Sequence, residues 1–393
     1  MSAVRPAPDL HAPAIDELFD AYREATGVVL RYGDHLLAAA GDSRDIHMAA
    51  GPDQVRRAAA LVHAALDETA GLGVAMGALP FEGSCDAVIR VPERVVRGLP
   101  LHRGVAPEPG WTITGLVPDP LPVEYENAVE RALAAIDAGE VEKVVLARSL
   151  LVEADRPIDA RIVARRLNAE EPGAFVFLVA LSGGASTLVG ASPELVVRRR
   201  GRKVFSDPLA GTARRLPDRV RDREIAQQLL DAVKEQREHR LVAEAVADGL
   251  TPFCSNLVVD SEAGLTSTAT LWHLHTAIKG TLKPDAPDAL TIAAALHPTP
   301  AVCGTPQGAA AALIGRLEPF DRRYFAGLVG WVDALGDGEW ALTLRCAEVS
   351  GSTARLHAGA GIVAGSEPAL EDLETEAKFS VGLRALGVEP AQV

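Results

Sequence analysis

Two groups of short strands joined by tight turns constrain the fold of this chain more than any other feature. The first group comprises residues 175–181, 186–190, 194–199 and 203–206. The second group comprises residues 327–332, 340–348 and 354–357. Gly183, Gly184 and Gly201 mark turns in the first group, and strands that follow one another through turns pair antiparallel. Grouped strands followed by long helices indicate an α+β fold rather than a βαβ repeat.

Helices are predicted before, between and after the two groups, where apolar residues recur at helical spacing. Their ranges are 53–67, 123–138, 158–168, 219–249, 288–296, 306–316 and 368–386. Further strands are predicted at residues 85–96, 111–116, 143–152 and 271–279. Prolines between positions 107 and 122 mark an irregular linker. We therefore divide the chain into an N-terminal part, residues 1–120, and a main part, residues 121–390.

The composition disfavours several classes of function. The 393 residues are 48% hydrophobic, which is ample for a large core, and the net charge of -14 argues against nucleic acid as a partner. The four cysteines form no Cys-x-x-Cys pair, so we expect a reduced, cytoplasmic protein without a zinc site. The sequence shows neither a signal peptide nor an apolar stretch of membrane-spanning length, so we expect no membrane association.

Two of the predicted helices each carry a pair of glutamates at Glu-x-x-Glu spacing. In the helix 219–249 the pair is Glu235 and Glu238. At helical spacing this pair shares a stripe with Val242 and Val246. Carboxylates beside valines are expected to be partly buried and to need cations or hydrogen-bond donors. The alternative is a solvated helix face with lysine and arginine partners.

The last helix repeats this arrangement with Glu371 and Glu374, which share a stripe with Lys378 and Val381. Glu374 and Lys378 also have the i,i+4 spacing of an ordinary surface ion pair. Two such helices in one chain leave a metal site and two unrelated surface pairs as equal alternatives. Mg²⁺ suits the site because hard cations bind carboxylate oxygens and complete their coordination with water or substrate oxygens.

Lys143 and Glu194 each stand alone beside apolar strand residues. Lys143 precedes the run 144–146 on a predicted central strand, where loss of water favours the neutral amine that can act as a base. Glu194 lies between a strand and a second apolar run. The alternatives are a lysine that reaches solvent at the start of a strand and a turn carboxylate at a sheet edge.

Further positions carry weaker signals. Gly359 and Gly361 follow a strand and precede the last helix, and glycines in such a loop let backbone N–H groups approach an anion. Arg345 lies within a predicted strand, where a buried arginine needs a carboxylate. His273, between Trp272 and Leu274, has the sequence context of a core histidine more often than of a catalytic one.

The order and type of these motifs resemble the chorismate-utilising enzymes, a family that includes isochorismate synthase, salicylate synthase, anthranilate synthase component I and aminodeoxychorismate synthase. The segments that carry the resemblance are Lys143-Val-Val-Leu, Gly190-Ala-Ser-Pro-Glu194, Leu209-Ala-Gly-Thr, Lys234-x-x-x-Glu238-His, His273-Leu, Leu296-His-Pro-Thr-Pro, Phe325-Ala-Gly-x-Val-Gly, Arg345-Cys-Ala, Gly359-Ala-Gly-Ile and Glu371-x-x-Glu374-Thr-x-x-Lys378. The resemblance implies that residues 121–390 form the chorismate-binding catalytic region and residues 1–120 a variable N-terminal part of the same fold. It also implies a large two-sheet fold, like that of anthranilate synthase component I, with helices packed outside.

By motif, the resemblance implies a Mg²⁺-dependent reaction of chorismate. Lys143 resembles the base that activates water for attack at C2 of the ring, and Glu194 resembles the acid that protonates the departing C4 hydroxyl. Glu238 and Glu374 resemble direct metal ligands, with Glu235 and Glu371 acting nearby or through water. The implied substrate-binding positions are Arg345, Lys378, Gly359 and Gly361 for the carboxylates, Thr212 and His273 near the ring hydroxyls, and Ala210, Gly211, Ala301 and Phe325.

Individual positions favour one reaction within the family. Ala210 occupies the place of a lysine in members that add nitrogen, which favours water as the nucleophile and makes a glutamine amidotransferase subunit unexpected. Ala301 stands where salicylate synthases commonly have threonine, and Phe325 stands where relatives often have a tyrosine whose hydroxyl would contact substrate. We predict an isochorismate synthase, an isomerase that acts as a monomer, with salicylate synthase as the alternative. The sequence leaves open whether its product feeds a siderophore, menaquinone or a salicylate-derived compound.

Overall fold

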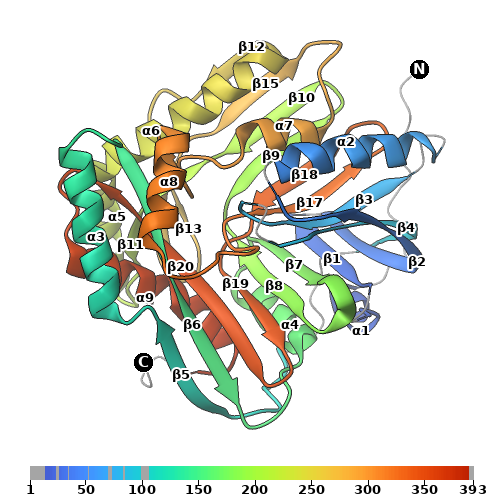
Figure 1. The fold of residues 1–393 in the computed structure, drawn as a ribbon, viewed down its shortest axis with the longest axis horizontal. Helices are drawn as coiled ribbons and strands as arrows, with labels where there is room; N and C mark the ends of the chain where they lie inside the picture. The colour runs from blue at the N-terminus through green and yellow to red at the C-terminus, as the bar shows by residue number, and fades with distance from the viewer. Residues whose placement is uncertain are drawn as a thin grey trace.

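The computed structural model describes residues 14–23, 26–33, 35–51, 53–69, 73–82, 85–98 and 106–388. Most of the strands form one continuous antiparallel sheet (Figure 1). In spatial order its strands are β12 (Cys254–Val259), β15 (Ile278–Leu282), β10 (Lys203–Asp207), β9 (Leu195–Arg200), β18 (Gly338–Leu342), β17 (Leu328–Asp333), β3 (Val74–Leu79), β4 (Ala87–Arg97), β2 (His35–Met48), β1 (Val28–Tyr32), β7 (Phe175–Ala180), β8 (Thr187–Ser192), β19 (Cys346–Ser350), β20 (Thr353–Val363), β6 (Lys143–Ala154), and then β5 (Ile113–Asp119) and β16 (Gly304–Thr305) on the same edge of β6.

A second, smaller sheet lies apart from the large one. It contains β11 (Leu209–Arg214), β14 (Leu271–His275) and β13 (Gly264–Ser267), in that order. The helices are α1 (Ile15–Asp20), α2 (Gln54–Asp67), α3 (Pro122–Asp137), α4 (Ala160–Glu170), α5 (Arg219–Asp231), α6 (Val233–Leu250), α7 (Ala289–Leu296), α8 (Gln307–Leu317) and α9 (Pro368–Ala385). None of the helices in the described ranges is long and apolar enough to cross a membrane.

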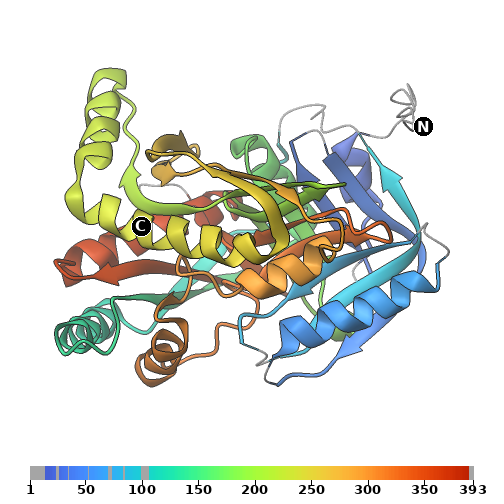
Figure 2. The same cartoon turned by 90° about the horizontal axis from the view of Figure 1, so that it is seen from above.

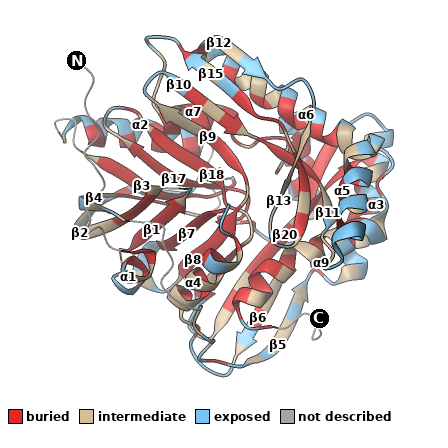
Figure 3. Cartoon of the chain, turned by 180° about the vertical axis from the view of Figure 1, so that it is seen from behind, coloured by how far each residue is buried: buried red, intermediate tan, exposed pale blue. Residues whose placement is uncertain are grey.

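The large sheet encloses an apolar core, and helices cover its outer faces. Met76 of β3, Val144 of β6, Phe177 of β7 and Trp340 of β18 are buried in one cluster, although their strands are far apart in the sheet order. Helices α2 and α7 pack on one part of the sheet, and α4 and α9 pack on another (Figures 1 and 2). Buried residues follow the strands, whereas α3 and α5 expose their outer sides (Figure 3). The predicted α+β fold with helices outside is confirmed.

The N-terminal residues supply strands to the middle of the large sheet. Strand β1 pairs with β7, and β3 pairs with β17, so residues 28–32 and 74–79 connect the two predicted meanders through backbone hydrogen bonds. The strands of both predicted meanders therefore belong to one hydrogen-bonded sheet.

The predicted helix 219–249 is two helices. Ala232 has an extended backbone (φ -72°, ψ 114°), which ends α5 and begins α6. Helix α5 packs on the small sheet, whereas α6 contacts both the small sheet and β20 of the large sheet. The local periodicity continues through Ala232, so tertiary packing and not propensity creates the break.

Two predicted strands are also interrupted. The range 271–279 divides at Thr276 into β14 of the small sheet and β15 of the large sheet. The range 340–348 divides into β18 and β19 around Arg345, whose φ of 49° lies in the left-handed region. We predicted Arg345 to be a strand residue, and this prediction is wrong. Arg345 belongs to a strained connection that turns its side chain toward the pocket between the sheets.

The expected glycine loop before the last helix is part of a strand. Gly359 and Gly361 lie within β20, opposite Ala147 and Val145 of β6. The Gly-x-Gly pattern resembles a loop because glycine is disfavoured in strands. In this chain the missing side chains leave room above β20.

A buried ion pair holds the strand that begins at Lys143. Arg322 donates to the carbonyl oxygens of Val145 and Val302, each at 2.7 Å, and its Nη2 lies 2.5 Å from Glu318 Oε1. Glu318 also accepts from the backbone N–H of Ala147 at 2.8 Å. The Arg322–Glu318 pair thus connects β6 to the segment around Val302, which follows α7.

We expect Arg322→Met to lower the free energy of unfolding by about 3–5 kcal/mol, because Glu318 is then left buried without its counter-charge. Chemical denaturation would measure the change. The matched control is Arg316→Met, whose exposed pair with Glu140 should contribute at most about 1 kcal/mol. Equal losses in the two variants would contradict the proposed importance of the buried pair.

Candidate active site

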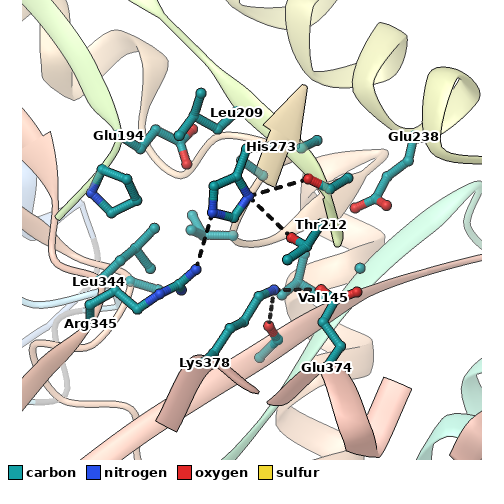
Figure 4. A pocket seen from close by; sticks show the side chains of 18 of the residues that line it. Val145, Glu194, Leu209, Thr212, Glu238, His273, Leu344, Arg345, Glu374 and Lys378 are labelled. Carbon is teal, nitrogen blue, oxygen red and sulfur yellow. Dashed lines mark hydrogen bonds and ion pairs between the residues drawn. The ribbon is translucent and has the colours of Figure 1, made fainter. Parts of the chain in front are cut away.

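A pocket of about 70 Å³ lies between the small sheet, α6, α9 and the β6–β20 pair. The predicted site residues that line it are Glu194, Ala210, Gly211, Thr212, Glu238, His273, Ala301, Phe325, Arg345, Gly359, Gly361, Glu374 and Lys378. Glu194 and Arg345 lie on one side of this pocket, and Glu238 and Glu374 lie on the other (Figure 4). Segments scattered over more than half of the chain therefore converge on one site.

Lys143, Glu235 and Glu371 lie just behind the pocket lining. Lys143 begins β6 and is fully buried, with its Nζ 2.9 Å from Oε1 of Glu238. Its side chain passes beside Gly361, where a Cβ would come within 3.0 Å of Lys143 Cε. The alternative of a lysine that reaches solvent is therefore excluded.

Glu194 occupies the connection between β8 and β9 and is buried rather than exposed at a sheet edge. Burial raises the pKa of its carboxyl group to about 8, although the backbone N–H of Leu209 and the charges of Lys143 and Arg345 act against this rise. A carboxyl group with this pKa is protonated at neutral pH. Glu194 can therefore donate a proton into the pocket.

Four glutamates from α6 and α9 form a cluster at the other side of the pocket. Burial raises the pKa of Glu235 to about 7, and the charges of Glu238 and Glu374 add to the rise while Lys234 opposes it. The pKa of Glu371 is raised by burial and by Glu374. Glu238 and Glu371 are thus buried, Glu235 and Glu374 are half-buried, and the two pairs face one another. Repulsion between them requires positive charge.

Three lysines supply that positive charge. Lys143 pairs with Glu238 at 2.9 Å, Lys234 pairs with Glu371 at 2.8 Å, and Lys378 pairs with Glu374 at 2.6 Å. Within the described ranges, no three His, Cys, Asp or Glu side chains are arranged to hold a metal ion as they stand. The glutamate oxygens are bound to ammonium groups.

The donor set nevertheless fits a hard divalent cation. All four members are carboxylates, the preferred ligands of Mg²⁺. One buried oxygen, Oε2 of Glu235, has no hydrogen-bond partner among the described residues. A buried acceptor without a donor is costly, and a cation or a water bound to a cation would satisfy it.

Thr212, His273 and Arg345 form a chain of polar contacts in the pocket. Nδ1 of His273 is 3.3 Å from the carbonyl oxygen of Gly211 and 3.2 Å from Oγ1 of Thr212 (Figure 4). Because a carbonyl oxygen only accepts, we assign the proton to Nδ1, which leaves Nε2 as an acceptor facing Nη2 of Arg345 at 3.5 Å. Burial and the neighbouring Arg345 charge lower the pKa of His273 well below its usual value, so the imidazole is neutral.

Arg345 and Lys378 present positive charge to the pocket. Burial lowers the pKa of Arg345 to about 10, and Glu171 is the first carboxylate that opposes this shift. Lys378 donates to the carbonyl oxygen of Gly359 at 2.7 Å. This contact uses the carbonyl oxygen of Gly359, not its N–H group. Arg345 and Lys378 are the candidates for binding carboxylates.

The remaining wall is small or apolar. Ala210 and Ala301 leave space, and the ring of Phe325 stacks on His357 with centroids 5.3 Å apart. Sequence reasoning missed the apolar lining residues Val145, Pro193, Leu209, Val302, Ala326 and Leu344. An apolar residue has no sequence pattern that distinguishes a pocket wall from a core. Lys234 was quoted within a motif but was given no role.

Residues 113–387 match the family described as chorismate binding enzyme. The chain belongs to this family. It is 45% identical over 322 residues to isochorismate synthase DhbC of Bacillus subtilis (strain 168), which covers 80% of this chain and 81% of that protein. It is 45% identical over 264 residues to isochorismate synthase EntC of Escherichia coli (strain K12), covering 67% of each chain.

Solved structures of chorismate-binding enzymes have the same fold. The crystal structure of a putative 2,3-dihydroxybenzoate-specific isochorismate synthase, DhbC, from Bacillus anthracis matches with a TM-score of 0.88 and 37% identity, covering 95% of this chain and 100% of that chain. Anthranilate synthase component I from Streptococcus pneumoniae matches with a TM-score of 0.69 and 21% identity, covering 92% and 91% of the two chains, which shows the fold alone. The predicted family and the predicted likeness to anthranilate synthase component I are confirmed.

A substitution at Gly361 tests whether the site depends on the contact between Lys143 and Glu238. A Cβ at this position would lie 2.0 Å from Oε1 of Glu238, the flexible end of the side chain, so Gly361→Ala should fold but displace that carboxylate. We expect chorismate to bind at least about tenfold more weakly in the presence of Mg²⁺, as measured by titration calorimetry.

The control for this substitution is Gly308→Ala in α8, where a Cβ meets nothing within 4 Å in the described part of the chain. Its affinity for chorismate should equal that of the unsubstituted protein. Unchanged affinity in Gly361→Ala would show that the placement of Glu238 does not matter for binding.

Proposed function

We propose that this protein is an isochorismate synthase, which reversibly isomerises chorismate to isochorismate by adding water at C2 and releasing the C4 hydroxyl group as water. The single observation that supports this most is that one pocket has a buried, protonated carboxyl group, Glu194, in its lining and a buried lysine, Lys143, behind Glu238 of its lining. Its relatives DhbC and EntC carry the same name at 45% identity.

In the proposed mechanism Lys143 acts as the base. Its Nζ lies beside Glu238, just behind the pocket lining. In this structure the ammonium group is the partner of Glu238, so in the proposed mechanism it first releases a proton and then accepts one from the water that attacks C2. The ring double bonds shift, and the bond from C4 to its hydroxyl breaks. One water enters and one water leaves, so the reaction is an isomerisation.

Glu194 acts as the acid in the same step. Hydroxide is a poor leaving group, and a carboxyl group that stays protonated at neutral pH can donate its proton to the departing oxygen. Glu194 belongs to the β8–β9 connection whereas Lys143 begins β6, so the two groups reach the ring from different elements. In the reverse reaction they exchange roles.

Arg345 and Lys378 are proposed to bind the two carboxylates of chorismate. Both side chains line the pocket, and they come from different elements, Arg345 from the connection between β18 and β19 and Lys378 from α9 (Figure 4). A guanidinium group can hold a carboxylate through two parallel hydrogen bonds. Thr212 and the neutral His273 line the same pocket and can exchange hydrogen bonds with ring hydroxyls.

A Mg²⁺ ion would be held by Glu238 and Glu374, with Glu235 and Glu371 binding through water or acting as nearby charges. When bound, it would neutralise a substrate carboxylate and stabilise negative charge that develops as the double bonds move. Glu238 and Glu374 are the two glutamates of the cluster that line the pocket, which supports giving them the direct contacts.

Small residues support water as the nucleophile and isomerisation as the end of the reaction. Ala210 offers no amine at the position where aminating relatives have lysine, so we propose that the enzyme acts without a glutamine amidotransferase subunit. Ala301 leaves open the position that is commonly threonine in salicylate synthases. We also propose that the enzyme is a monomer in the cytoplasm.

Incubation with chorismate and Mg²⁺ should give isochorismate without salicylate or pyruvate, and added ammonium salts should give no aminated product. Chromatography of the products measures this. Lys143→Ala and Glu194→Gln should each lower turnover by at least about 100-fold, the contribution of one general acid or base. Salicylate and pyruvate in equal amounts would support the salicylate synthase alternative, and near-normal turnover of Lys143→Ala would remove its assigned role.

The pH dependence should report the protonation of Glu194. Because its pKa is raised to about 8, the donating form is present below this pH and is lost as the pH rises through it. We expect kcat/KM to fall about tenfold per pH unit above this value. This decline should be missing from the residual activity of Glu194→Gln, and constant activity up to pH 10 would contradict the assignment of Glu194 as the acid.

A further inference from the structure

Three lysines, Lys143, Lys234 and Lys378, pair with the glutamate cluster. The proposed mechanism gives Lys234 no role. Its Nζ lies 2.8 Å from Oε1 of Glu371 and 3.4 Å from Oε1 of Glu235. Glu371 is almost fully buried, with 2% of its side chain exposed, whereas Lys234 keeps 31% of its side chain exposed. The ion pair thus joins an inner carboxylate to an ammonium group at the protein surface.

The position of Lys234 in its helix is unfavourable by itself. It is the second residue of α6, where the unpaired backbone N–H groups and the helix dipole favour carboxylates and disfavour cations. The compensation comes from across the site, because Glu371 belongs to α9. The placement is therefore explained by the glutamate cluster and not by the helix.

The cluster also has a carboxylate oxygen next to Lys234 that could accept a further bond. Oε2 of Glu235 is buried and lacks a hydrogen-bond partner within the described ranges, although Oε1 of the same side chain lies near the ammonium group. One ammonium group offers three donors but cannot surround itself with oxygens as a metal ion does. A divalent cation would satisfy more of these oxygens than the lysine does.

We propose that Lys234 is the resident counter-ion of the glutamate cluster and competes with the divalent cation for Glu371 and Glu235. In the metal-free protein its ammonium group prevents repulsion between the carboxylates and keeps them in place. When the metal enters, the flexible side chain moves into solvent, to which it already has access. Lys234 thereby sets the free metal concentration at which the site fills.

This inference rests on the proposed Mg²⁺ site but concerns a residue outside the reaction. Lys143 and Lys378 contact the cluster too, but each has a proposed role toward substrate or water. Lys234 does not line the pocket, so its replacement changes the balance of charge at the glutamates without removing a substrate contact.

The test is calorimetric titration of the protein with Mg²⁺ in the absence of chorismate. Lys234→Gln should bind Mg²⁺ at least about tenfold more tightly, because the metal no longer displaces a bound ammonium group. The melting temperature of the metal-free variant should be lower, and Mg²⁺ should raise it by more than in the unsubstituted protein. Lys234→Arg, which keeps the charge, should bind Mg²⁺ as the unsubstituted protein does.

The matched control is Lys203→Gln on β10, which removes the same charge from an exposed side chain outside the pocket. Its affinity for Mg²⁺ should be unchanged. Equal or weaker Mg²⁺ binding by Lys234→Gln, relative to this control, would overturn the competition.

A second measurement does not depend on a variant that folds. In a crystal structure of the unsubstituted protein with Mg²⁺ bound, Nζ of Lys234 should lie beyond about 4 Å, the limit of an ion pair, from the carboxylate of Glu371. An intact pair beside a fully occupied metal would overturn the proposal. If turnover of the unsubstituted protein does not depend on Mg²⁺, the metal-dependent function fails as well, whereas Mg²⁺-dependent turnover with no gain in Lys234→Gln removes only the role of Lys234.

Discussion

The burial of the Lys143 ammonium group is the interaction on which the rest of the site depends. A fully buried cation is unstable without a counter-charge, and Glu238 supplies one at 2.9 Å. That distance requires α6 to approach β20 closely, and the approach requires a glycine at 361 because a Cβ would collide with the carboxylate. One ion pair therefore requires Lys143 on β6, Glu238 on α6 and Gly361 on β20.

The elements around this ion pair are fastened by further buried charges. Nε of Arg148 on β6 donates to Oγ1 of Thr375, and its Nη2 lies 2.9 Å from Oδ1 of Asp372, both on α9. The same helix carries Glu371 and Glu374, so the position of the glutamate cluster relative to Lys143 is fixed through Arg148. Behind β6, Arg322 and Glu318 bind its backbone. Directional polar contacts of this kind define one arrangement where apolar packing alone would allow several.

The sequence was informative where function depends on the spacing within one element. Helical periodicity placed Glu238 beside Val242, and both are buried as that pattern predicts. It also placed Glu371 on the inner face of the last helix. The isolated charges Lys143 and Glu194 were found because each stands beside apolar strand residues, and the structure buries both. Their assignment to one reaction came from resemblance, since no local pattern shows that these two groups share a pocket.

Features that depend on contacts between distant segments were missed. The break at Ala232 has no helix-breaking residue. Both helices contact the small sheet, and α6 alone of the two also reaches β20 of the large sheet. The left-handed backbone at Arg345 was read as a strand because the residues on both sides favour strands. The glycines of β20 resemble a loop in the sequence because the carboxylate that needs the space at Gly361 comes from α6, which is more than a hundred residues earlier. In each case a tertiary contact overrides the local preference.

The two functional glutamates differ because of their surroundings and not because of their chemistry. Glu194 is buried with a backbone N–H as its hydrogen-bond partner and no lysine pair, so burial dominates and its pKa rises to about 8. Burial would raise the pKa of Glu238 too, but Lys143, with Lys234 and Lys378, holds it below its usual value. In the proposed mechanism the same residue type therefore serves as a neutral proton donor on one side of the pocket and as an anionic metal ligand on the other. A pocket that keeps a protonated and an ionised glutamate apart can supply a proton at one ring carbon. At another ring carbon it can hold positive charge and a base. An exchange of hydroxyl groups across a ring requires both.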